Sequence, residues 1–178
     1  IWLDAQGNCR SKIKVTELSS RLSNINELSE WNYDGSSTGQ AETAKSEVIL
    51  RPVKYVPDPF RITNESYLVL CETYQPDGTP LPSNTRHHAT TIFNMDSEHK
   101  EPMFGLEQEF FISRKTVGQL VPVSFPDNQT VPSPQGDYYC GRNIGEKVSR
   151  EHMNACIQAG ISICGTNAEV MLGQWEYQ

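Results

Sequence analysis

"FGLEQEFFI" (residues 104–112) is the stretch that decides the fold of the second half of the chain. On a β-strand, residues two apart share a face, so Glu107 and Glu109 point the same way. The opposite face is apolar apart from Gln108, with Phe104, Leu106, Phe110 and Ile112 along it. The two glutamate Cα atoms would lie about 6.6 Å apart, and like charges at about 6 Å repel by about 3 kcal/mol at an effective dielectric of about 20. An exposed polar face explains the pair, whereas a buried pair would need a cation or a proton.

A second pair of glutamates, Glu169 and Glu176, repeats the pattern near the end of the sequence. The runs "GTNAEV" (165–170) and "QWEYQ" (174–178) predict two short strands, and a tight turn through residues 171–173 would pair them as a hairpin. Both acids would then face one side of adjacent strands. Four carboxylates from three strands on one sheet face would suit a hard divalent cation such as Mg²⁺ or Mn²⁺.

The first part of the sequence reads as strands and turns. Four runs predict strands: "IWLD" (1–4), "KIKV" (12–15), "SEVILRP" (46–52) and "SYLVLCETY" (66–74). The first two flank a turn-rich segment and predict a hairpin. The last run ends at "QPDGTP" (75–80), a strong turn signal. We therefore expect one domain over residues 1–80 and a second over residues 84–178.

Two helices are expected after this turn. Residues 85–95 follow Ser83 and Asn84, either of which is a fair N-cap. The stretch "SREHMNACIQAG" begins with a second N-cap, Ser149, and ends at a glycine. Residues 117–136 contain four prolines and no clear period, so they are expected to form a loop. The order strands, helix, strand, helix and hairpin indicates an α+β fold.

Composition bounds the class of protein. The 178 residues carry a formal charge of −7 and show no basic stripe, which argues against nucleic acid as a partner. No window approaches the run of about 18 apolar residues that spans a membrane, and no signal peptide is visible. The five cysteines form no C-x-x-C pair, which is typical of small core residues in a reducing compartment. We therefore expect a cytoplasmic protein with neither a nucleic-acid nor a membrane partner.

The stretch "EWNYDGSSTGQA" (30–41) is rich in turn-forming residues yet carries Trp31 and Tyr33. Composition alone favours a plain loop. The aromatic pair instead suggests an ordered loop that packs against something, and an acid such as Asp34 on that loop could act as a base.

Seven stretches of the sequence are long, ordered and unusual. They are "WNYDGSSTGQA" (31–41), "DPFR" (58–61), "LVLCE" (68–72), "NTRH" (84–87), "FGLEQEFF" (104–111), "PQGDYYCG" (134–141) and "GTNAEVMLGQWEYQ" (165–178). Together they closely resemble glutamine synthetase in its eukaryotic-type (type II) form, over essentially the whole chain. The resemblance implies a β-grasp domain followed by the first part of a catalytic domain, with an antiparallel sheet and helices. It also implies a ligase of glutamine biosynthesis and nitrogen metabolism, which joins L-glutamate and ammonium with ATP.

The resemblance also assigns site residues. Three of them match ligands of the divalent metal, Mg²⁺ or Mn²⁺, nearer the glutamate and ammonium pocket: Glu109, Glu169 and Glu176. Glu107 matches a ligand of a second metal, which bridges the ATP phosphates. Asp34 matches the acid that binds ammonium and removes its proton. Four residues are implied to border the nucleotide: Glu107, Glu176, Tyr177 and Gln178. The chain departs from the family pattern at Met103, where Trp is usual.

The resemblance further implies homo-oligomeric rings, in which the loop carrying Asp34 completes the active site of the neighbouring subunit. The remaining metal ligands and the substrate-binding arginines are implied to lie beyond Gln178. The sequence is therefore expected to be an N-terminal and central fragment that is inactive by itself. Two alternatives stay open: a related γ-glutamyl-amine ligase acting on a larger amine, and a non-catalytic structural relative.

Overall fold

The computed structural model describes residues 1–17, 21–61, 65–95, 102–123 and 138–178. The chain divides into two compact units, Ile1–Pro102 and Met103–Gln178. Both units combine antiparallel strands with a helix, so the predicted α+β class is confirmed. Among the described residues, no helix is long and apolar enough to cross a membrane.

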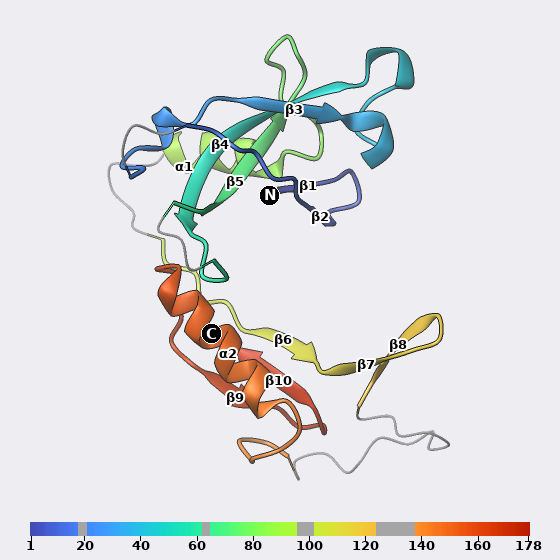
Figure 1. Ribbon diagram of the computed structural model, residues 1–178, viewed down its shortest axis with the longest axis vertical. Coiled ribbons are helices and arrows are strands. Elements are labelled where there is room, and N and C mark those ends of the chain that lie inside the picture. The colour runs from blue at the N-terminus through green and yellow to red at the C-terminus, as the bar shows by residue number, and fades with distance from the viewer. Residues whose placement is uncertain (18–20, 62–64, 96–101, 124–137) are drawn as a thin grey trace. The chain divides into compact units, whose positions relative to one another are not determined.

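The first unit is built on a three-stranded antiparallel sheet with the order β3-β4-β5 (Figure 1). Its strands are β3 (Trp31–Asp34), β4 (Glu47–Pro57) and β5 (Tyr67–Tyr74). The predicted strands at 46–52 and 66–74 are therefore confirmed. Val48, Leu50 and Tyr74 are almost fully buried and form the centre of this unit, as expected for β-forming runs with one covered face.

A hairpin of β1 (Trp2–Leu3) and β2 (Cys9–Arg10) precedes this sheet. The hairpin was predicted, but its second arm is Cys9–Arg10 and not residues 12–15. The reason is Asp4, whose buried Oδ1 accepts hydrogen bonds from the backbone N–H groups of Gln6 at 2.9 Å and Asn8 at 2.8 Å. Arg10 closes the turn, since its Nε donates to Asp4 Oδ2 at 2.8 Å.

Asp4 makes the stability of the first unit depend on pH. Burial alone would raise the pKa of Asp4, but hydrogen bonds from Asn8, Arg10 and Gln6 bring it below its ordinary value. A lowered folded pKa means that the stabilisation is complete above the unfolded pKa of about 3.9 and is lost as pH falls through the folded value. We expect Asp4→Asn to destabilise this unit at neutral pH, by an amount that shrinks below pH of about 4.

Urea unfolding at several pH values, followed by fluorescence of Trp2 and Trp31, checks this expectation. Glu17→Gln, which changes an exposed carboxylate, is the matched control. If the difference in free energy of unfolding between wild type and Asp4→Asn grew on acidification, the lowered pKa of Asp4 would be contradicted.

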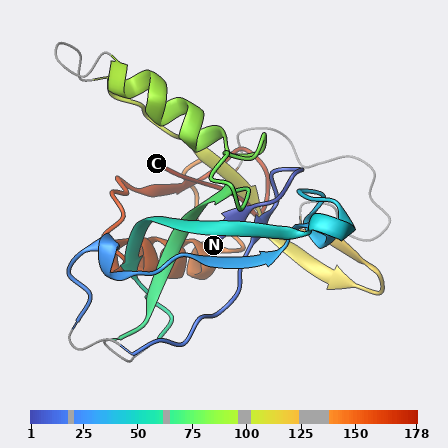
Figure 2. The ribbon, with the colours of Figure 1, turned by 90° about the horizontal axis from the view of Figure 1, so that it is seen from above.

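Helix α1 (Thr85–Met95) occupies the predicted range and begins at Asn84, one of the two predicted caps. The Asn84 side chain accepts a hydrogen bond from His87 N at 3.1 Å and donates one to Thr73 O at 3.1 Å. These bonds fasten the start of α1 to β5, and the helix then extends away from the strands (Figure 2). Helix α1 therefore belongs to the first compact unit, which extends to Pro102.

Three short 3₁₀ helices complete the first unit: η1 (Ile25–Glu27), η2 (Gly35–Thr38) and η3 (Thr43–Lys45). Asn24 and Glu27 close η1 with a capping box, in which each side chain accepts from the backbone of the other.

The second unit contains an antiparallel sheet with the order β6-β10-β9. Its strands are β6 (Gln108–Phe111), β10 (Gln174–Tyr177) and β9 (Thr166–Ala168). The predicted hairpin is confirmed, and Gln174 N donates to Met171 O at 3.0 Å across a turn in which Gly173 has φ 71°. The predicted strand 104–112 was too long, because β10 offers partners only to residues 108–111. Phe104 and Leu106 consequently remain exposed.

Helix α2 (Glu146–Gln158) packs against this sheet (Figure 1). The prediction that Ser149 caps it was wrong, because the helix begins earlier, after Gly145. A φ of 98° suits glycine at this position, and a Cβ there would lie 2.4 Å from Ile112 Cγ1. Ser149 is instead buried inside the helix, while Gly160, with φ 72°, ends it as predicted.

A second hairpin joins β7 (Ser113–Thr116) to β8 (Gln119–Pro122). The loop prediction for residues 117–136 was therefore wrong for 119–122, where Gly118, with φ 83°, permits a tight turn. Residues 124–136 lie outside the described part of the chain. All five cysteines are free, and three of them, Cys9, Cys140 and Cys164, are exposed and not the predicted core residues.

Candidate functional site

One face of the second sheet carries three of the predicted acids. The strand register places Glu109 on β6 directly opposite Glu176 on β10, and Glu176 directly opposite Asn167 on β9. Directly opposed residues share a face, so the two carboxylates point the same way. Glu169 follows β9 immediately, and its N–H donates to Gln174 O at 2.9 Å. The Glu176 side chain is buried, with only 7% of its residue surface exposed.

Two amide side chains hold these carboxylates. Asn167 Nδ2 lies 3.3 Å from both Glu169 Oε1 and Glu176 Oε2. Gln174 Nε2 donates to Glu109 Oε2 at 2.7 Å. The sequence analysis gave these amides no role, although the period of two along each strand already put Asn167 with Glu169, and Gln174 with Glu176.

The electrostatics of the cluster show its excess of negative charge. The pKa of Glu169 is raised, first by burial and then by a hydrogen bond with the side chain of Glu176. The charges of Glu176 and Glu109 add to this shift, and the N–H of Val170 opposes it. A carboxylate that resists ionisation beside two others is in an environment that a bound cation would relieve.

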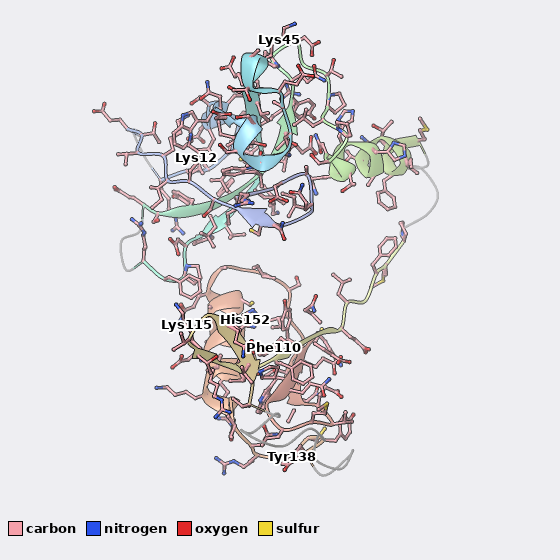
Figure 3. All side chains as sticks on the ribbon, turned by 90° about the vertical axis from the view of Figure 1, so that its right-hand side faces the viewer. Lys12, Lys45, Phe110, Lys115, Tyr138 and His152 are labelled. Atoms are coloured by element: carbon pink, nitrogen blue, oxygen red, sulfur yellow. The ribbon has the colours of Figure 1, made fainter. Side chains whose placement is uncertain are left out.

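The opposite face of the sheet is aromatic and rests on α2. Phe110, Tyr177 and His152 form a cluster with ring-centroid distances of 6.3 Å for Phe110–His152, 6.1 Å for Phe110–Tyr177 and 4.5 Å for His152–Tyr177. Figure 3 labels Phe110 and His152 in this cluster. Trp175 is buried beside them, and its Nε1 donates to Ile144 O at 2.9 Å. The predicted apolar backing of the acids is thus confirmed at Phe110, and Tyr177 lies on the face away from the glutamates.

The remaining predicted residues of this unit lie at its margins. Glu107 precedes β6 and is exposed, and Gln178 is exposed after β10. Within the described ranges, no three histidine, cysteine or acidic side chains converge closely enough to hold a metal ion. The donor set of Glu109, Glu169 and Glu176 nevertheless fits Mg²⁺ or Mn²⁺ in kind, since every donor is a carboxylate oxygen.

Tyr139 and Cys140 lie close to the same cluster. Cys140 N donates to Ala168 O at 2.8 Å, which fastens this segment to β9. The pKa of Tyr139 is raised, first by the neighbouring Cys140 thiol and then by the charges of Glu169 and Glu176. The Tyr139 residue is more than half exposed.

Asp34 lies in the first unit, at the end of β3, so the predicted loop 30–41 is in part a strand. Its Oδ1 accepts hydrogen bonds from Ser36 N at 2.9 Å and Ser36 Oγ at 2.6 Å, and thereby caps η2. These bonds lower the pKa of Asp34. The carboxylate is exposed and ionised at neutral pH, which suits the binding of a small cation.

Comparison with known proteins identifies similar proteins. The glutamine synthetase β-grasp domain matches residues 1–76. A chloroplastic glutamine synthetase of Zea mays is 46% identical over 184 aligned positions, which cover 100% of this chain and 42% of the maize protein. The chain is thus similar to glutamine synthetase over its whole length, and its first 76 residues match the β-grasp domain of that family. A glutamine synthetase of Agaricus bisporus is 44% identical over 100% of this chain and 49% of its own length.

The matched regions can be placed on the structure and on the length of the related proteins. Residues 1–76 include β1 to β5, so the first unit contains the predicted β-grasp domain of glutamine synthetase. The chain spans about half the length of the curated glutamine synthetases it matches. Similar proteins include cytosolic isozymes of Arabidopsis thaliana and rice as well as the chloroplastic maize protein.

Proposed function

We propose that the protein carrying this chain is a glutamate–ammonia ligase, which uses ATP to amidate L-glutamate through a γ-glutamyl phosphate intermediate. The supporting observation is the gathering of Glu109, Glu169 and Glu176 on one sheet face, with Glu176 buried and the pKa of Glu169 raised. Buried like charges are costly unless a cation or a proton compensates them. A purely structural sheet would gain nothing from them.

The three glutamates would hold one Mg²⁺ or Mn²⁺, and Glu107 would contribute to a second ion nearer the ATP phosphates. Such ions neutralise charge on a transferring phosphoryl group and orient it for attack by the γ-carboxylate of glutamate. The aromatic backing formed by Phe110, Tyr177 and His152 keeps β6 and β10 in register. It therefore fixes the direction in which Glu109 and Glu176 point. Glu107, Glu176, Tyr177 and Gln178 would border the nucleotide.

Asp34 would bind ammonium in a neighbouring subunit of a ring-shaped homo-oligomer and take up its proton. Ammonium must lose a proton before its nitrogen can attack the acyl phosphate. The lowered pKa of Asp34 favours the first of these roles, because an ionised carboxylate attracts the cation. The cytosolic relatives favour a cytoplasmic location for the protein.

The test is phosphate release from ATP by the intact protein, measured with and without L-glutamate, ammonium and Mn²⁺. We expect release to require all three, and polyamines to replace ammonium poorly. Release with polyamines but not with ammonium would favour the γ-glutamyl-amine ligase. No release under any condition would favour a non-catalytic relative and contradict the proposal. Residues 1–178 alone are expected to release none, because the resemblance puts the remaining metal ligands and substrate arginines outside them.

A further inference from the structure

Two amide side chains donate hydrogen bonds to the three glutamates of the candidate site. Asn167 and Gln174 each place an amide nitrogen on the cluster, and together they reach all three acids. Asn167 is only partly exposed, and 7% of the Gln174 surface is accessible. A buried amide such as that of Gln174 is costly unless its hydrogen bonds are made.

The amides take one oxygen of each carboxylate. Asn167 occupies Oε1 of Glu169 and Oε2 of Glu176, while Gln174 occupies Oε2 of Glu109. Glu169 Oε2 accepts from the backbone N–H of Val170 at 3.3 Å. In the described part of the chain, no hydrogen bond is made to the second oxygen of Glu109, whereas the Glu176 side chain also shares a hydrogen bond with Glu169. Glu109 is therefore held at one oxygen, and its other oxygen remains available to a ligand.

Gln174 is itself fixed at both ends. Its Oε1 accepts from Met171 N at 3.2 Å, and its backbone N–H closes the turn to Met171 O at 3.0 Å. The amide nitrogen can then point only toward Glu109, because the carbonyl end is occupied. Asn167 is fixed by register, since it lies directly opposite Glu176 in the β9–β10 pair.

We propose that Asn167 and Gln174 are positioning residues, which hold one oxygen each of Glu109, Glu169 and Glu176 and so limit the directions in which these carboxylates can turn toward a divalent cation. The proposal rests on the proposed function, since it assumes that these glutamates bind metal. Groups that hydrogen-bond to metal ligands fix the ligand orientation and typically account for about 10- to 100-fold in metal affinity. Asn167 on β9 and Gln174 on β10 would orient the glutamates in this way.

The test is Mn²⁺ affinity of the intact protein, measured by electron paramagnetic resonance of free Mn²⁺ in the absence of substrates. We expect Asn167→Ala and Gln174→Met each to weaken Mn²⁺ binding by about 10- to 100-fold. Asn154→Ala, on an exposed position of α2, is the matched control and should bind as wild type does. Far-UV circular dichroism establishes that each variant is folded, and if one position does not tolerate change the other decides.

The outcomes distinguish the positioning role of the two amides from metal binding by the glutamates. Wild-type affinity in both folded variants would overturn the positioning role and leave the metal site in place. Absence of Mn²⁺ binding to the wild-type protein would overturn the metal site, and the positioning role with it.

Discussion

Replacing Glu176 with glutamine is expected to weaken Mn²⁺ binding more than about 100-fold, beyond the effect of changing a residue that only supports a ligand. Glu176 lies on the central strand of its sheet, opposite Glu109 on one side and Asn167 on the other. Glutamine keeps the shape of the side chain and removes its charge. The same change should raise the stability of the metal-free protein, because it removes a negative charge that acts on Glu169.

Weaker Mn²⁺ binding together with higher stability of the metal-free protein would identify Glu176 as a residue that serves binding at the expense of folding stability. Thermal unfolding in EDTA and in excess Mn²⁺ measures both effects: the variant should unfold at a higher temperature in EDTA and show a smaller gain with Mn²⁺. Glu151→Gln, on the exposed surface of α2, is the matched control. A variant that is less stable in EDTA and gains as much from Mn²⁺ as wild type would show that Glu176 has a structural role only.

Replacing Trp175 with alanine is expected to destabilise the second unit by about 3–5 kcal/mol, as for other buried large aromatic side chains. Only 5% of Trp175 is exposed, and its Nε1 bonds to Ile144 O just before α2 begins. Register places it opposite Phe110 and Ala168, so its ring supports all three strands from the face away from the glutamates. The change would leave a cavity and free the start of α2.

Urea unfolding followed by circular dichroism measures this loss. Trp31→Ala is the matched control, because Trp31 lies in the first unit and its half-buried ring carries the Lys12 ammonium 3.5 Å from its centroid. The control should leave the transition of the second unit unchanged. A loss below about 1 kcal/mol in Trp175→Ala would mean that this residue does not support the sheet in the way the structure shows.

The acid cluster was predictable because two local rules agree on it. Alternation along "NAEV" and "QWEY" sets the faces of Glu169 and Glu176, and the turn at Gly173 sets their pairing. The position of Glu109 opposite Glu176 was not predictable from its own strand. Register between strands distant in sequence depends on tertiary packing, which local periodicity does not contain.

The errors have physical causes of the same kind. Ser149 has the chemistry of an N-cap, but burial against the sheet draws it into the helix, and Gly145 provides the backbone conformation at which the helix begins. Residues 104–107 have the alternation of a strand, but β10 ends before it can pair with them. The turn-forming residues around Asp34 predict a loop. The strand β3 that ends at Asp34 depends on pairing with β4, which the local sequence does not reveal.

The central claim is that Glu109, Glu169 and Glu176 bind one divalent cation. Anomalous diffraction at the manganese edge, from crystals of the intact protein grown with Mn²⁺, tests it most directly. We predict a manganese peak within coordination distance of carboxylate oxygens of all three glutamates, and its loss in Glu176→Gln. Manganese peaks elsewhere with none at these three side chains would contradict the account.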